Sequence, residues 1–142
     1  MPNLLDGFSL RPDGMTLEQT VLALGIGLGI VHIACQSLSS LFQRGGKWAA
    51  GTRDDTPVAS ILTGRFERAS RNFQETFPLF LALVVLISLT NRSGAVSQWG
   101  AMAWLVGRTV YLPAYATGSG IRPFAFILSL IGLLAMLIHL FL

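Results

Sequence analysis

Four long apolar segments, separated by short polar ones, dominate the chain. They predict helices over residues 16–42, 57–90, 94–117 and 122–142, and each reaches the roughly 20 residues that a hydrocarbon core of about 30 Å requires. Glycine, serine and charged residues gather between them, which is typical of turns. The pattern therefore predicts an all-α integral membrane protein, a bundle of four transmembrane helices forming one domain over residues 1–142.

The composition supports a membrane location. Hydrophobic residues make up 52% of the chain and charged residues 12%, against about 25% charged residues in ordinary soluble domains. A chain of 142 residues could not bury so much apolar surface in one aqueous core. Intrinsic disorder is excluded by the same composition, and a water-soluble enzyme is not expected.

The net charge and the positions of the potential metal ligands limit the partners that we expect for the protein. The net charge of +3 is scattered along the chain, whereas nucleic-acid binding needs a basic stripe on one face, so we expect no nucleic-acid partner. The single cysteine, Cys35, and the two histidines, His32 and His139, lie without acidic neighbours at metal-ligand spacing. We therefore expect no metal.

Basic residues predict the orientation. Most basic residues lie in the first and third loops and at the adjoining start of the second helix. They are Arg44, Lys47, Arg53, Arg65, Arg68, Arg71 and Arg122. On the opposite side stand only Arg11 and Arg92. The positive-inside rule then places these two loops in the cytoplasm and both termini on the non-cytoplasmic side, in the inner membrane if the cell is bacterial.

The second predicted helix has a polar half. Its apolar stretch, residues 77–89, covers only about 20 Å of the membrane, so residues 67–76 are drawn into or just above the inner part of the bilayer. A charge there costs about 2.5–3.5 kcal/mol on insertion scales. Polar side chains at that depth need an ion-pair or hydrogen-bond partner.

The spacing places these polar residues on one face. Arg68, Asn72 and Glu75 follow one another at i, i+4 and i+7, so they share a helix face. Arg71 lies beside that face and is spaced to pair with either Glu67 or Glu75 at i±4.

The third predicted helix carries a matching stripe. Arg108, Tyr111 and Tyr115 occupy i, i+3 and i+7, and Arg122 stands at the mouth of the fourth helix. Two helices thus bring polar stripes to the same depth on the same side.

Three interpretations fit these stripes. Arginines and glutamates could neutralise one another in a structural ion-pair network. They could form an ion or proton pathway, although this more often needs titratable groups in series and only Glu75 is deep. We favour a site for a small anionic or zwitterionic molecule, because the arginines of the stripes outnumber Glu67 and Glu75 and arginine forks suit carboxylates.

Two segments resemble one known family. Residues 65–80, RFERASRNFQETFPLF, are similar to the signature of the MAPEG superfamily, the membrane-associated proteins in eicosanoid and glutathione metabolism. Residues 107–111, GRTVY, followed by Tyr115 and Arg122, resemble the end of that family's third helix. The likeness covers essentially the whole chain. The family includes microsomal glutathione transferases.

The resemblance implies a homotrimer of four-helix bundles in membrane lipid, with a site between neighbouring subunits. Glutathione, as co-substrate, would lie near the cytoplasmic side, and a lipophilic electrophile would reach it from the lipid. Residue by residue, Arg68, Asn72 and Glu75 would hold the tripeptide's carboxylates and amine, with Arg71 beside them.

The same resemblance gives roles to the other stripe. Tyr111 and Tyr115 would line the pocket and Arg108 would support it, while Arg122 matches an arginine that faces the sulfur. Some members place a second arginine there, for which Arg44 is the nearest candidate.

The chemistry expected of such a site is thiol activation. A free thiol has a pKa near 8.5, and a neighbouring guanidinium lowers that pKa by stabilising the thiolate. We expect a microsomal-type glutathione transferase or peroxidase. The alternative is a non-catalytic lipid- or ligand-binding scaffold of the same fold, and a transporter is disfavoured because the chain shows no inverted repeat.

His32 and Gln36 are the remaining polar residues of interest. They lie four residues apart in the first helix, and the spacing predicts a buried hydrogen-bonded pair.

Overall fold

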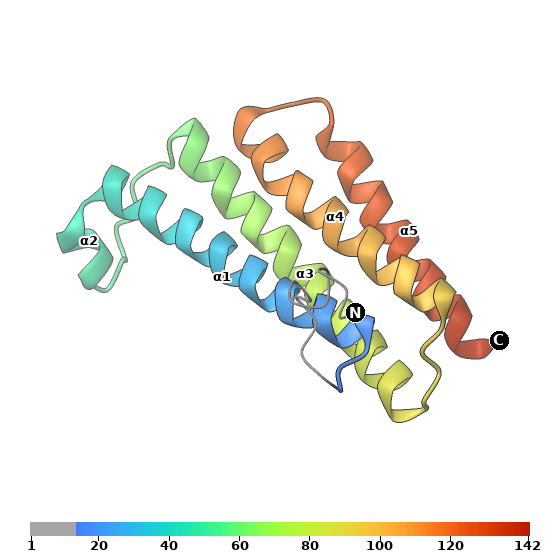
Figure 1. The fold of residues 1–142 in the computed structure, drawn as a ribbon. Coiled ribbons are helices and arrows are strands. Elements are labelled where there is room, and N and C mark those ends of the chain that lie inside the picture. Colours follow the sequence, from blue (N-terminus) through green and yellow to red (C-terminus); the bar gives the residue numbers. More distant parts are fainter. Residues whose placement is uncertain (1–13) are drawn as a thin grey trace, which may run out of the picture.

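The regular structure of the described residues is helical throughout (Figure 1). The computed structural model describes residues 14–142, so the predicted side of the N-terminus lies outside the described residues. The helices are α1 (Leu17–Arg44), α2 (Gly46–Ala50), α3 (Ile61–Leu89), α4 (Ala95–Thr117) and α5 (Arg122–Phe141). The sequence did not predict the short α2, which lies in the first loop.

Capping residues set where the helices begin. Thr16 caps α1, because its Oγ1 accepts a hydrogen bond from the backbone N–H of Gln19 while the Gln19 side chain accepts one from the Thr16 N–H. Ser60 caps α3 by accepting from the N–H of Thr63 at 3.2 Å. This cap starts the helix at Ile61, whereas the sequence predicted a start at 57, and such exchanges satisfy the free N–H groups of a first turn.

The four long helices lie side by side and alternate in direction (Figure 1). α1 packs mainly against α3, and α4 packs mainly against α5, while α3 and α4 also meet. Trp104 is fully buried at the centre of the core, and its ring stacks on Phe80 with the ring centroids 3.9 Å apart.

Glycines allow α4 and α5 to approach closely. A Cβ on Gly100 would lie 2.8 Å from the carbonyl oxygen of Gly132, and a Cβ on Gly107 would lie 2.6 Å from that of Ala125. Real side chains do not fit at such distances. The two backbones therefore touch, and this fixes the position of α5 and of its first residue relative to α4.

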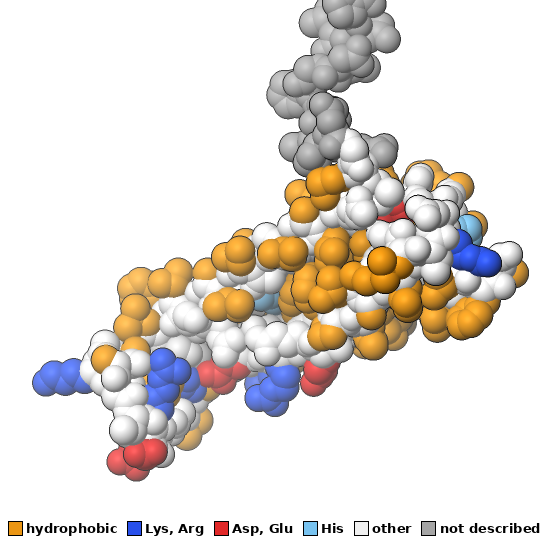
Figure 2. Space-filling model, turned by 90° about the horizontal axis from the view of Figure 1, so that it is seen from below, with side chains coloured by type: hydrophobic (Ala, Val, Ile, Leu, Met, Phe, Trp, Pro, Cys, Tyr) orange, Lys and Arg blue, Asp and Glu red, His pale blue; other side chains and the backbone are white. Residues whose placement is uncertain are grey.

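The surface of the bundle suits lipid. α1, α3 and α5 are each long and apolar enough to cross a membrane, and their outward faces carry large apolar side chains such as Ile30, Leu79 and Ile131. On the face seen in Figure 2, apolar side chains cover much of the surface, and most of the charged ones lie toward the end that carries α2. The protein is therefore an integral membrane protein. α4 is not among the helices that meet these criteria, and it holds the buried Arg108.

Candidate functional site

Two hydrogen bonds connect the polar stripes of α3 and α4. Arg68 Nε donates to the hydroxyl oxygen of Tyr115 at 3.1 Å. Farther along the helices, Arg108 Nη1 donates to Oδ1 of Asn72 at 2.6 Å. Since the members of each pair come from different helices, the side chains that the sequence placed at the same depth do meet.

Tyr115 connects these residues to the start of α5. The guanidinium carbon of Arg122 lies 4.7 Å from the centroid of the Tyr115 ring, and that of Arg68 lies 5.8 Å away. Tyr111 meets Tyr115 edge to face, with the ring centroids 5.5 Å apart. The Tyr115 ring therefore positions two arginines, through cation–π contacts worth about 0.5–2 kcal/mol each.

A cavity of about 380 Å³ opens beside these arginines. Its lining consists of Arg65, Arg68, Tyr115, Gly118, Ser119, Gly120, Arg122 and Pro123. Three guanidinium groups thus line one cavity with no acidic residue among them. Such a wall suits an anion, because arginine presents paired N–H donors to carboxylates.

Arg65 is a lining residue that the sequence reasoning did not assign to the site. Its Nη1 donates to the carbonyl oxygen of Ala116 near the end of α4, at 2.9 Å. Gly118 has a positive φ of 74°, and a Cβ there would lie 2.7 Å from Arg65 Nη2. Its position three residues before Arg68, on the same helix face, is the signal that could have indicated it.

Arg108 is 0% exposed and only partly satisfied. Its Nε and Nη2 find no hydrogen-bond partner among residues 14–142. Its guanidinium carbon lies 5.2 Å from the Phe126 ring centroid and 5.5 Å from that of Tyr111. Taking such a charge out of water costs several kcal/mol, which ring contacts offset in part.

Two of the predicted site residues do not contact the polar side chains that meet between α3, α4 and α5. Arg71 and Glu75 are exposed on α3, and neither makes an ion pair within 4.0 Å with any of residues 14–142. The predicted pairing of Arg71 with Glu67 or Glu75 is wrong, because Glu67 Oε1 instead lies 2.8 Å from Arg44 Nη1. A helix end brings Arg44 within reach of Glu67, and i±4 spacing alone could not reveal that competition.

Arg44 lines a different cavity of the chain. It lines a polar cavity of about 450 Å³ with Trp48, Arg53 and Glu67, and its guanidinium carbon lies 4.7 Å from the centroid of the Trp48 ring. Neither Arg44 nor Glu67 lines the cavity beside Arg122. Its participation in a sulfur site therefore stays a prediction.

No metal centre can be built from the described part of the chain. Residues 14–142 contain no group of three or more His, Cys, Asp or Glu side chains that could hold a metal ion. The side chains that meet between α3, α4 and α5 carry guanidinium, phenol and amide groups.

The long apolar helices define a helical integral membrane protein. Basic and aromatic side chains meet between its helices α3, α4 and α5. The model of the MAPEG family matches residues 21–142, and the chain belongs to this family, as the sequence motifs predicted. Its members are membrane-embedded proteins of glutathione and eicosanoid metabolism. Comparison with curated proteins gives no match, and comparison with solved structures gives none either.

Proposed function

We propose that this protein is a membrane-bound glutathione transferase or peroxidase. It activates the glutathione thiol for attack on a lipophilic electrophile or a lipid hydroperoxide. In this proposal α4 is the fourth transmembrane span, the protein is a homotrimer with both termini on the non-cytoplasmic side, and the site opens to the cytoplasm.

The surplus of unpaired guanidinium groups carries the proposal. Arg65, Arg68 and Arg122 line one cavity, and none of them has a carboxylate oxygen of residues 14–142 within 4.0 Å. Arg108 is fully buried, and two of its nitrogens have no hydrogen-bond partner among residues 14–142. Glutathione carries two carboxylates, so it would supply the negative charge that this part of the protein lacks.

Glu75 and Arg71 support a site that is completed between subunits. Both are exposed on a helix long and apolar enough to span a membrane. Ionisable residues at such depth pair with one another or with a ligand. The carboxylate of Glu75 suits the ammonium group of glutathione, and Arg71 suits a carboxylate of the ligand or of a neighbouring copy.

Arg122 is the candidate for thiol activation. It is the first residue of α5, and its guanidinium is held against the Tyr115 ring. A guanidinium beside the sulfur stabilises the thiolate, whose electron pair forms a carbon–sulfur bond with the electrophilic carbon. In an addition the π bond at that carbon breaks and the resulting anion takes up a proton, and in a substitution the leaving group departs with the electron pair of its bond to carbon. With a hydroperoxide, thiolate attack on the terminal oxygen gives an alcohol and a sulfenic acid, and a second glutathione converts the latter to a disulfide and water.

Calorimetry on the purified protein in detergent tests the proposal. The parent protein should bind glutathione, and Arg68→Ala or Glu75→Ala should weaken binding more than about tenfold, as expected for the loss of a charged hydrogen bond. Arg92→Ala is the control, because Arg92 lies in the turn between α3 and α4, away from the cavity lining. The absence of glutathione binding by the parent would refute the proposal.

A second measurement isolates the activation step. Arg122→Ala should reduce the ultraviolet absorbance of bound thiolate while leaving glutathione affinity within about threefold, because the sulfur contributes less to binding than the two carboxylates do. Unchanged thiolate absorbance would assign thiol activation to another group.

The alternative function is a non-catalytic ligand-binding scaffold. A groove of about 510 Å³ between α3 and α5 is lined by Ala82 and leucines alone, which suits an acyl chain and offers no reactive group. Turnover decides between the two. A scaffold would show no product with a panel of lipophilic electrophiles and hydroperoxides, whereas the proposed enzyme would consume glutathione with at least one of them.

A further inference from the structure

Arg65 of α3 holds the end of α4. Its Nη1 donates a hydrogen bond to the carbonyl oxygen of Ala116 at 2.9 Å. Ala116 lies in the last turn of α4, which ends at Thr117 and has no basic residue of its own. The carbonyls of a last turn have no partner within their helix, and a guanidinium there supplies both a donor and a charge that complements the helix dipole. The end of α4 is therefore fixed to α3 at Arg65.

The same guanidinium lies against the turn that follows α4. A Cβ on Gly118 would lie 2.7 Å from Arg65 Nη2, 3.0 Å from its Cζ and 3.2 Å from its Nη1. The Gly118 N–H donates to the carbonyl oxygen of Tyr115 at 3.2 Å. The Ser119 N–H donates to that of Ala114 at 2.9 Å. These bonds close the turn onto the helix end, so Arg65 holds both together.

The turn leads directly to Arg122, the candidate for thiol activation. The Arg122 N–H donates to the carbonyl oxygen of Ser119, within the turn, at 3.3 Å. α5 begins without a side-chain cap on Ile121, and its second residue, Pro123, has no N–H to donate. Because an uncapped first turn is weakly fixed by its own helix, the orientation of Arg122 depends on the turn that precedes it.

Tyr115 connects Arg65 to Arg122 by a second route. The Tyr115 ring lies 4.7 Å from the guanidinium carbon of Arg122, and the residue directly precedes Ala116 in the chain. The contact of Arg65 with the Ala116 carbonyl therefore also fixes the backbone that carries this ring.

We propose that Arg65 is a positioning residue for thiol activation. By holding the end of α4 and the turn over residues 118–121, it keeps the guanidinium of Arg122 beside the sulfur of bound glutathione. This inference rests on the proposed function of the site. Arg65 also adds positive charge to the cavity, and that charge acts on the ligand directly, whereas the positioning acts only through Arg122. Experiments can therefore separate the two contributions.

Hydrogen exchange tests whether Arg65 holds the turn, in the purified full-length protein without glutathione. Arg65→Met keeps most of the alkyl stem and removes the guanidinium. We expect residues 116–124 to exchange at least about fivefold faster, the factor that one hydrogen bond is worth. Unchanged exchange of this segment would overturn the proposal, whether or not the protein binds glutathione.

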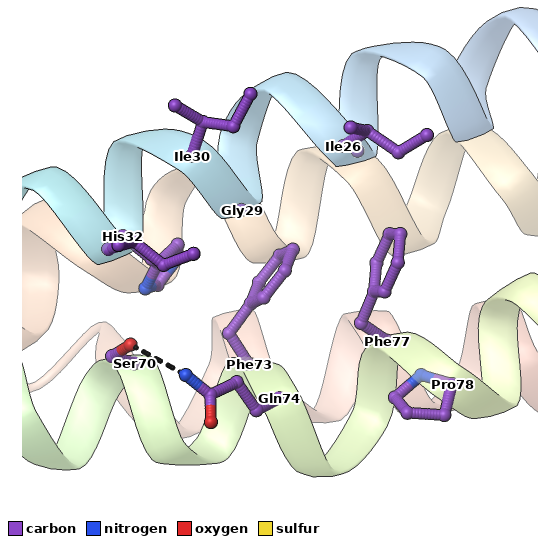
Figure 3. A pocket seen from close by; sticks show the side chains of 11 residues that line it. Ile26, Gly29, Ile30, His32, Ser70, Phe73, Gln74, Phe77 and Pro78 are labelled. Atoms are coloured by element: carbon purple, nitrogen blue, oxygen red, sulfur yellow. Dashed lines mark hydrogen bonds between the residues drawn. The ribbon is translucent and has the colours of Figure 1, made fainter.

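Two variants are controls for the exchange measurement. Arg53→Met removes a contact of the same kind, because Arg53 Nη2 donates to the carbonyl oxygen of Ala49 at the end of α2, at 3.0 Å. Gln74→Ala removes a hydrogen bond within α3. Figure 3 shows the Gln74 amide turned toward Ser70, to which it donates at 3.4 Å beside a cleft between α1 and α3. Residues 116–124 should exchange as in the parent, and faster exchange in either control would overturn the proposal.

The pH dependence of bound-thiolate absorbance tests whether the turn acts through Arg122. Arg65→Met should raise the apparent pKa of the bound thiol by about one pH unit, within the range of about 1–3 that a nearby opposite charge is worth. In an Arg122→Ala background the same change should add less than about 0.3 unit, because residues that act through one another are not additive. An equal change in both backgrounds would overturn the proposal, since Arg65 would then act through its own charge.

Arg65→Lys keeps the test decisive if Arg65→Met does not fold, which thermal unfolding reports. Lysine keeps the charge, but a single ammonium cannot both donate to the Ala116 carbonyl and lie along Gly118 as a planar guanidinium does. Exchange and thiol pKa should rise by smaller amounts, and no change in either would overturn the proposal. A parent that binds no glutathione would refute the proposed function, while faster exchange in Arg65→Met would still show that Arg65 positions the turn before Arg122.

Discussion

Arg108 on α4 and Asn72 on α3 form a 2.6 Å hydrogen bond from Nη1 to Oδ1. The donor is charged and completely buried, and such charge-assisted bonds are about twice as strong as neutral ones. The bond therefore fixes α3 against α4 at the depth of the polar stripes. Among residues 14–142, two nitrogens of Arg108 have no hydrogen-bond partner, and no carboxylate oxygen lies within 4.0 Å of its guanidinium.

Asn72→Asp should stabilise the protein and weaken glutathione binding. The new carboxylate would neutralise Arg108 at hydrogen-bonding distance and so remove part of its desolvation penalty, while repelling the carboxylates of the ligand. We expect a higher midpoint of thermal unfolding in detergent and at least about a fivefold loss of glutathione affinity by calorimetry. Asn91→Asp, the same change in the turn after α3, is the control and should alter neither. A lower unfolding midpoint for Asn72→Asp would contradict this account of Arg108.

Tyr115→Phe should distinguish the contribution of the Tyr115 hydroxyl group from that of the Tyr115 ring. It removes the oxygen that accepts from Arg68 and keeps the ring that contacts Arg122. We expect glutathione affinity to fall about threefold to tenfold, the value of one hydrogen bond, with bound-thiolate absorbance unchanged. Tyr115→Leu should lower both quantities. Equal behaviour of the two variants would show that the ring does not position Arg122.

Gly118→Ala should disturb the site through Arg65. The added Cβ would meet Arg65 Nη2 at 2.7 Å, and alanine is strained by roughly 1–2 kcal/mol at the positive φ of this position. We expect a lower unfolding midpoint and weaker glutathione binding. Gly45→Ala is the matched control, because Gly45 also has a positive φ, of 84°, but a Cβ there meets nothing within 4 Å and the residue does not line the cavity. If both variants bind glutathione like the parent, Arg65 has no part in the site.

Gly100→Ala should separate α4 from α5. Its Cβ would lie 2.8 Å both from the carbonyl oxygen of Gly132 and from the side chain of Met136, and overpacking of this kind costs about 1–3 kcal/mol. Gly27→Ala, in α1 where a Cβ meets nothing within 4 Å, should be neutral or stabilising, since alanine is the better helix former. Thermal unfolding measures both changes, and an unaltered midpoint for Gly100→Ala would mean that the helices can move apart at no cost.

The sequence by itself determined the helical membrane character of the protein and the stripe of α3. Apolar length and the 3.6-residue period are local properties, so they place the helices and give Arg68 and Asn72 a common face before any tertiary contact is known. The two motifs also indicated the family that the match over residues 21–142 confirms. Local spacing misjudged Arg71, because Glu67 pairs with a residue from another helix.

The tertiary structure decided which charges remain unpaired. Arg44 forms an ion pair with Glu67, and Asn72 accepts a hydrogen bond from one nitrogen of Arg108. The backbone carbonyl of Ala116 holds Arg65 at the cavity. It also left both ring nitrogens of His32 without a hydrogen-bond partner among residues 14–142, so the predicted bond with Gln36 is wrong. Sequence spacing describes neighbours along one helix, whereas hydrogen bonds and ion pairs are made with whichever helix packs alongside, and that depends on glycine contacts such as those between α4 and α5.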